Sequence, residues 1–236
     1  MNTPTLKALL GLLAAALLAG CGVDSASTDY FPLAPGLNWQ YRLVRSTMDG
    51  TAELRHAITA RAPGREGIAG VRVSLSGATH EYVRDDDGLH RVKNGTSGTI
   101  PEGSAVEKSL VLPSRPQIGT RWQSVSATTV LENSGPPWET LFRVNVTVPM
   151  TYEVESMQAT IETPAGTFSR CMVIRGHGAT RADIGSNIGI TNVSVSSREW
   201  FAPGVGLVRM ERTESSSVDA LKEGSLMMEL DTVYDY

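Results

Sequence analysis

EWFAPGVGLVRME, residues 199 to 211, holds two apolar segments around a short reversal of the chain. Pro203 fixes its own φ, and the glycines on either side of Val205 permit the positive φ values that tight turns need. The residues after this turn are again strand formers. The stretch therefore predicts a β-hairpin. Trp200 and Phe201 should point to opposite faces, so that one is buried and the other lies at the rim or outside.

Alternation of apolar and polar residues extends this pattern through most of the chain. It is clearest in four runs, at residues 39–43, 71–75, 141–148 and 226–234. Turn sequences such as DGT, DDDG, NSGPP and TPAGT separate the runs, while helical periodicity is limited to one or two turns at VDALKEG. The sequence predicts an all-β fold, either an antiparallel sandwich or a curved, partly open barrel, with little helix outside the signal peptide.

The amino terminus has the features of an export signal. Lys7 precedes an apolar run from Ala8 to Ala19 that is too short for an ordinary membrane-spanning helix. The run ends in Leu-Ala-Gly before Cys21, which resembles the lipobox of bacterial lipoproteins. The alternative is an ordinary signal that happens to precede a cysteine. We therefore expect a lipoprotein signal peptide at residues 1–20.

The lipobox resemblance implies a lipid anchor at Cys21. In such lipoproteins the cysteine sulfur carries a diacylglycerol, cleavage precedes the cysteine, and the new amino terminus usually gains a third acyl chain, often palmitate. Two or more chains give lasting anchorage. Gly22, in place of Asp, implies the outer membrane and a position facing the periplasm or the surface in a Gram-negative cell. A Gram-positive source would place the anchor in the plasma membrane.

Residues 21–29 read as a lipidated tether, and residues 30–236 as one β-rich domain. The tether GVDSASTD lacks apolar periodicity and spans at most about 28 Å, so the domain should stay near the membrane.

The pattern G-x-x-W-Q occurs in both APGLNWQ and PQIGTRWQ. It either marks two related halves, 30–115 and 116–236, or is a coincidence. Residues 94–116 are rich in Gly, Ser and Pro and predict a long surface loop.

Composition excludes some functions and limits others. The net charge is −4 and there is no clustered basic stripe, which argues against nucleic-acid binding. If Cys21 is lipidated, Cys171 is the only other cysteine and no internal disulfide can form. Cys171 lies in a strand-like run and is expected to be a small buried apolar side chain, the alternative being a reactive thiol.

Recognisable catalytic motifs are absent from the sequence, so we expect a protein that is not an enzyme and needs no cofactor. His80 and His90 flank the DDDG turn and are weak candidates for metal ligands with Glu81 or Asp85, but a metal site needs three or four ligands. Exposed strand histidines are the alternative. The DDDG acidic run lacks calcium-loop spacing, and a hairpin turn explains it without an ion.

Three segments together resemble a group of uncharacterised bacterial envelope lipoproteins. They are YFPLAPGLNWQYRL at 30–43, TPAGTFSRCMVIR at 163–175 and EWFAPGVGLVRME at 199–211. This resemblance implies a secreted β-rich fold with no assigned activity.

The sequence favours a non-catalytic, membrane-anchored binding or scaffold module of the cell envelope. Its partner would be an apolar or peptide-like ligand or an envelope protein, and Trp200 and Phe201 are weak candidates for the ligand-binding surface. The alternatives are an assembly factor for an envelope complex, and a hydrolase whose dispersed site would include His80, His90 and residues 85–87.

Overall fold

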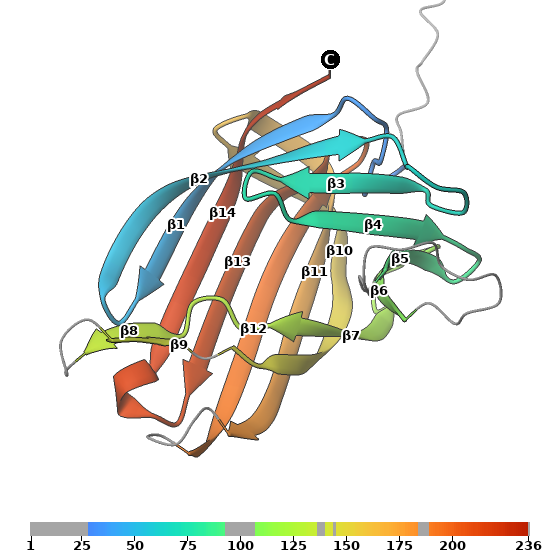
Figure 1. Cartoon of the computed structure of the whole chain (residues 1–236). Coiled ribbons are helices and arrows are strands. Elements are labelled where there is room, and N and C mark those ends of the chain that lie inside the picture. The colour runs from blue at the N-terminus through green and yellow to red at the C-terminus, as the bar shows by residue number, and fades with distance from the viewer. Residues whose placement is uncertain (1–27, 93–106, 136–139, 144, 184–188, 236) are drawn as a thin grey trace, which may run out of the picture.

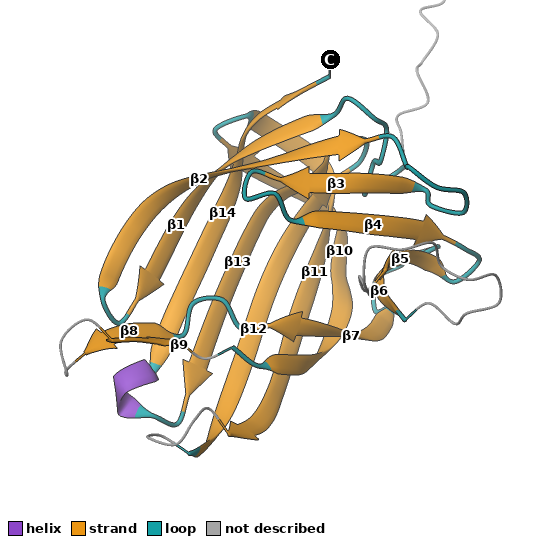
Figure 2. Ribbon diagram, viewed as in Figure 1, coloured by secondary structure: helices purple, strands orange, loops and turns teal. Residues whose placement is uncertain are grey.

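The computed structural model describes residues 28–92, 107–135, 140–143, 145–183 and 189–235. These residues form fourteen β-strands and one short 3₁₀ turn, η1 (Asp219–Leu221). Figure 2 colours the strands orange and the turn purple. The strands are β1 (Asn38–Thr47), β2 (Gly50–Arg61), β3 (Gly70–Ser74), β4 (Thr79–Arg84), β5 (Gly88–Val92), β6 (Lys108–Pro113), β7 (Arg121–Ala127), β8 (Glu132–Gly135), β9 (Thr140–Arg143), β10 (Thr147–Thr163), β11 (Gly166–Asp183), β12 (Ile190–Ala202), β13 (Gly206–Ser216) and β14 (Glu223–Tyr234).

Twelve of these strands form one antiparallel sheet in the order β6-β5-β4-β3-β2-β1-β14-β13-β12-β11-β10-β7, and β8 pairs with β9. The sheet curls until its two terminal strands approach each other, so that it is nearly closed (Figure 1). The predicted all-β class is confirmed, and the curved, partly open barrel is the form observed. The short helical segment at 218–224 is also confirmed as a single turn.

One face of the sheet, which we call the concave face, lines the inside of the curl. Directly paired residues of antiparallel strands share a face, which allows a row to be followed across the sheet. One such row carries Trp122, Tyr152, Gly176, Ser197, Arg212 and Leu226. Its members lie on the concave face, because the guanidinium of Arg212 on β13 reaches Ser126 on β7, although three strands lie between β13 and β7 in the sheet order.

The predicted hairpin at residues 199–211 is present as the end of β12, a turn and the start of β13. Gly204 and Gly206 have φ values of 76° and 99°, as that turn requires. Trp200 and Phe201 belong to different core clusters, and both are buried, with 8% and 5% exposure. The expectation that one lies at the rim or outside is therefore wrong.

Both aromatic side chains are covered because the sheet is covered on both faces here. Phe201 packs against the segment before β1, which includes Phe31 and Leu33. Trp200 packs with the end of the β10–β11 hairpin, residues 157–170, through Ile161 and Phe168. Register shifts in β10 bend this hairpin back over the sheet, and the Ala165 N–H donates to the Leu230 carbonyl at 3.0 Å.

Other sequence expectations meet the structure in different ways. Cys171 is fully buried, as predicted, and burial raises the pKa of its thiol to about 11. Trp39 and Trp122 are each the second residue of a strand and follow a glycine of positive φ by three positions, but whether the halves are repeats stays a prediction. The run 141–148 is divided between β9 and β10, with residue 144 outside the described residues.

The loop predicted over 94–116 is partly wrong, because β6 lies within it and pairs with β5. The apolar run SLVLP supplies that strand, although the Gly, Ser and Pro residues around it resemble a loop. The signal peptide, Cys21 and most of the tether lie outside the described residues.

Candidate functional site

A strap of chain, residues 126–132, runs from β7 across the concave face to β8 (Figure 1). Glu214 on β13 anchors it. This carboxylate is fully buried and accepts the N–H groups of Thr129 and Val130, each at 2.9 Å. Carboxylates bind backbone N–H groups through strong charge-assisted hydrogen bonds. The strap is therefore fixed to the sheet rather than resting on it.

Two arginines complete this attachment. Arg212 donates to Glu214 at 2.6 Å, to the Ser126 hydroxyl at 2.9 Å and to the Ala127 carbonyl at 2.8 Å. Arg45 on β1 forms an ion pair with Glu132 at 2.5 Å and donates to the Thr129 carbonyl. All three nitrogens of Arg212 are thus engaged in holding the strap.

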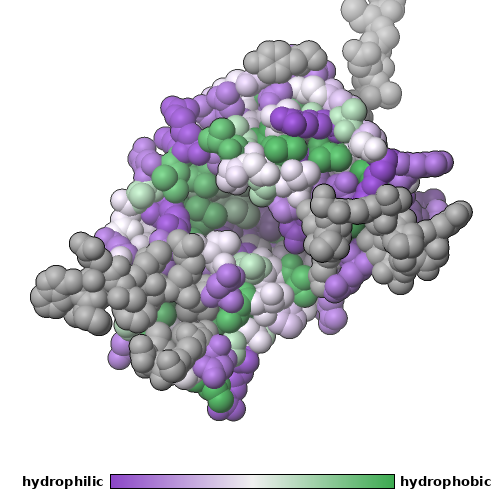
Figure 3. Space-filling view, in the orientation of Figure 1, coloured by the Kyte–Doolittle hydropathy of each residue, from purple (hydrophilic) through white to green (hydrophobic). Residues whose placement is uncertain are grey.

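Above the strap the concave face opens into a hollow with apolar residues around it (Figure 3). The cross-strand pairs Leu43–Met228, Met210–Met228 and Arg212–Leu226 place four apolar side chains on the concave face. Leu43, Met210 and Leu226 are only half-buried. We call Leu43, Met210, Leu226 and Met228 the apolar floor. Long, flexible methionine side chains suit a surface that must adapt to an apolar ligand.

Glu199 places a carboxyl group beside the apolar floor. It pairs with Ile174 on one side and Met210 on the other, so it shares their face. Burial among these neighbours raises the pKa of Glu199 to about 7, although Arg212 and Ser197 act to lower it. The nearby Ser197 hydroxyl is buried, and no described residue meets it at ordinary hydrogen-bond geometry. Shifted carboxyl groups in hollows are frequent at functional sites.

Two aromatic rings border this carboxyl on the side of β7 and β10. Trp122 and Tyr152 stack with ring centroids 5.5 Å apart, and burial raises the pKa of Tyr152 to about 12. Gly176 makes room for them, because a Cβ there would lie 2.6 Å from the Tyr152 ring and 2.5 Å from the Ser197 hydroxyl. The indole N–H of Trp122 is buried without a hydrogen-bond partner among the described residues.

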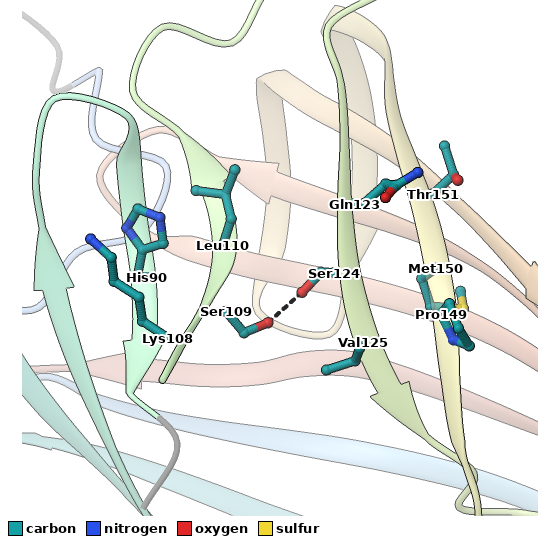
Figure 4. Close-up of a pocket in the computed structure, with 10 residues that line it drawn as sticks. All are labelled: His90, Lys108, Ser109, Leu110, Gln123, Ser124, Val125, Pro149, Met150 and Thr151. Carbon is teal, nitrogen blue, oxygen red and sulfur yellow. Dashed lines mark hydrogen bonds between the residues drawn. The ribbon is translucent and has the colours of Figure 1, made fainter. Parts of the chain in front are cut away.

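A second depression, which we call the seam groove, lies where the sheet edges meet (Figure 4). β6 pairs only with β5 and β7 only with β10, so each has one free edge. The hydroxyls of Ser109 and Ser124 bridge these edges at 2.6 Å. The groove holds about 540 Å³ and is lined by His90, Lys108, Ser109, Leu110, Gln123, Ser124, Val125, Pro149, Met150 and Thr151.

The structure separates the histidines that flank the DDDG turn. His90 pairs with Val83, whereas His80 shares the face of Tyr82, so the two imidazoles point to opposite faces of the hairpin. His90 lies 3.4 Å from Asp85, and Glu81 binds Arg65 instead. The described residues contain no cluster of three ligands that could hold a metal ion.

The DDDG acidic run forms a hairpin turn, as predicted. The Asp85 side chain accepts the N–H groups of Asp87 and Gly88, and its pKa is lowered chiefly by a hydrogen bond from Lys108. Gly88 has a φ of 146°.

The sequence reasoning missed the residues of the concave face. Trp200 and Phe201, its candidates for ligand binding, are core residues. The missed signal is the alternation in TNVSVSSREW, which puts Val193, Val195, Ser197 and Glu199 on one face. A glutamate on the apolar face of a strand departs from that pattern and marks the site.

Comparison with known proteins gives a partial match. Residues 144–218 match the model of a family described as DUF3108-like. A search of the curated proteins finds no match.

Two crystal structures resemble the chain at low identity. A candidate exported protein with a YmcC-like fold from Bacteroides fragilis NCTC 9343 is 13% identical, with a TM-score of 0.43, over 89% of this chain and 100% of that one. A candidate lipoprotein from Parabacteroides distasonis ATCC 8503 is 14% identical, with a TM-score of 0.39, over 88% and 99%.

Among the described residues, helices with the length and apolar character needed to cross a membrane are absent.

Proposed function

We propose that this protein is a non-catalytic binding module of the cell envelope, held at the membrane by a lipid on Cys21, which carries an amphiphilic ligand on its concave face. The observation that supports this most is the apolar floor beside Glu199. Half-buried Leu43, Met210 and Leu226 share the concave face, which is hollowed in Figure 3. Ligand sites are commonly concave and apolar with a few placed polar groups.

The strap gives this hollow a fixed shape. The strap is held by ionic contacts: Glu214 binds Arg212 and the strap backbone, and Arg45 binds Glu132 of the strap. The strap is therefore in place before a ligand binds. A preformed site loses less entropy on binding than a flexible one. The lipid anchor would keep such a site within reach of membrane amphiphiles.

Uptake of the apolar fluorescent probe N-phenyl-1-naphthylamine by the purified folded domain tests this proposal. We expect Leu226→Gln to weaken probe binding several-fold, because it makes the apolar floor polar. Met227→Gln is the matched control, since Met227 is equally half-buried on the same strand but faces the other way. Equal probe binding by the two variants, or no uptake by the wild type, would count against a ligand site here.

The free edges of β6 and β7 favour a second candidate, an assembly factor that binds an envelope protein. Unpaired strand edges are templates for adding another strand. Chemical crosslinking followed by native purification separates the candidates. A stoichiometric protein partner supports assembly, whereas co-purified lipid supports the carrier.

A further inference from the structure

β5, which lies beside the seam between β6 and β7, carries an inward arginine that has no ionic partner among the described residues. Arg91 on β5 pairs with Tyr82 and with Ser109. Tyr82 is buried in the core, and the Ser109 hydroxyl bonds to Ser124, which pairs with the buried Met150. Residues paired across strands share a face, so Arg91 points to the inside of the curl.

The guanidinium of Arg91 is half-buried and makes no ion pair or hydrogen bond within the described part of the chain. Other inward arginines are satisfied by the protein: Arg45 and Arg212 are paired with Glu132 and Glu214. Arg72, which pairs with His80, donates to the Pro32 carbonyl and lies over two aromatic rings. A partly desolvated cation without a counter-ion is costly unless something else satisfies it. Its isolation therefore needs an explanation.

Other hydrogen-bond donors gather near Arg91. Its charge acts on Tyr152 and on His80, which shares the inward face of the β4–β5 hairpin. Trp122 stacks on Tyr152, and its buried indole N–H has no partner. The pKa of His80 is lowered, first by burial and then by the charge of Arg91, so both effects disfavour a second positive charge on this imidazole.

We propose that Arg91, with the Trp122 indole N–H and the Tyr152 hydroxyl, binds the oxyanion head group of an amphiphile whose chain lies on the apolar floor. This assignment rests on the proposed function and adds the class of ligand. An arginine fork matches a carboxylate or a phosphate in two hydrogen bonds, and an indole N–H can only donate. Glu199 pairs with Met210 of the apolar floor, so it lies between the proposed head-group site and the floor, where the chain of the ligand would begin.

Competition among ligands with the same chain and different heads tests the proposal. The probe is N-phenyl-1-naphthylamine bound to the folded domain, displaced by dodecanoate, dodecyl phosphate, dodecanol or dodecylamine. We expect the two anionic compounds to displace it at concentrations about tenfold lower than dodecanol, and dodecylamine to be the weakest. The order of dodecanoate and dodecyl phosphate tells a carboxylate ligand from a phosphate one.

Arg91→Gln should remove the anionic preference and leave the affinity for dodecanol unchanged, while Arg91→Lys should keep part of it. Arg121→Gln is the matched control, because Arg121 is exposed on the neighbouring edge strand and pairs with Glu153 outside the hollow. Thermal unfolding by circular dichroism verifies that each variant is folded.

The possible results separate the two proposals. Failure of the wild type to take up the probe would overturn the proposed function. Probe uptake with equal displacement by all four compounds, or an anionic preference that survives Arg91→Gln, would overturn the role of Arg91 and leave the apolar site standing.

Discussion

The carboxylate of Glu214 and the guanidinium of Arg212 lie 2.6 Å apart on the concave face and are almost fully buried, with 0% and 8% of their side chains exposed. They stand two residues apart on β13 and together hold the strap through its backbone. Ion pairs of this kind are expensive to break from one side, because the remaining charge stays buried without compensation.

Glu214→Ala should lower the free energy of unfolding by about 3–5 kcal/mol, since it leaves the buried Arg212 and two strap N–H groups without their acceptor. The measurement is urea denaturation followed by tryptophan fluorescence. Glu211→Ala on the same strand is the control. Its carboxylate is much more exposed, and surface ion pairs contribute about 0–1 kcal/mol. Similar losses for the two variants would contradict the anchoring role of Glu214.

Gly176→Ala should destabilise the protein by about 1–3 kcal/mol, because the new methyl group collides with the Tyr152 ring and the Ser197 hydroxyl. The same variant should also shift the near-ultraviolet circular dichroism of the Trp122–Tyr152 stack. Gly64→Ala is the control, because a Cβ there meets nothing within 4 Å. An unchanged spectrum for Gly176→Ala would mean that Tyr152 does not depend on this space.

The sequence was sufficient to predict the all-β class, the hairpin at residues 199–211 and the turn at Asp85. Alternation identifies β12 and β13 because a half-buried strand must alternate, and the Pro203 and Gly204 turn can only reverse the chain. The hairpin at Asp85 follows for the same reason. Both predictions use interactions between neighbours in the sequence.

The site depends on contacts that neighbours in sequence do not reveal. Arg212 meets Ser126 across 86 positions, and Arg45 reaches the strap across a similar separation. The prediction for Trp200 and Phe201 failed because the bent β10–β11 hairpin covers the second face. Bulges produce that bend, and alternation gives no sign of where they fall.

Cys21→Ser should move the protein from the membrane fraction to the soluble fraction, because residue 21 would have no sulfur to which the diacylglycerol could be attached. Fractionation and labelling with radioactive palmitate provide the measurement. Ser25→Ala alters the tether, keeps the cysteine and should leave the protein membrane-bound. Retention of Cys21→Ser in the membrane, after washing with salt, would disprove the lipid anchor at this residue.

Glu199 should make the stability of the fold decline as the pH rises through the range from about 4.5 to 7. Its pKa is raised to about 7 by burial, from an ordinary value of 4.5, so within this range the folded state holds a proton that the unfolded state has lost. The folded state is then favoured by acid, with a total effect on the order of 3 kcal/mol that is complete above pH 7.

Glu199→Gln, which cannot ionise, should remove this decline and be the more stable protein at pH 8. Denaturation curves from pH 4 to 8 for the variant and the wild type give the difference directly, with the exposed Glu223→Gln on β14 as control. A constant difference between wild type and Glu199→Gln across this range would show that the carboxyl titrates normally and that the hollow is open to water at this point.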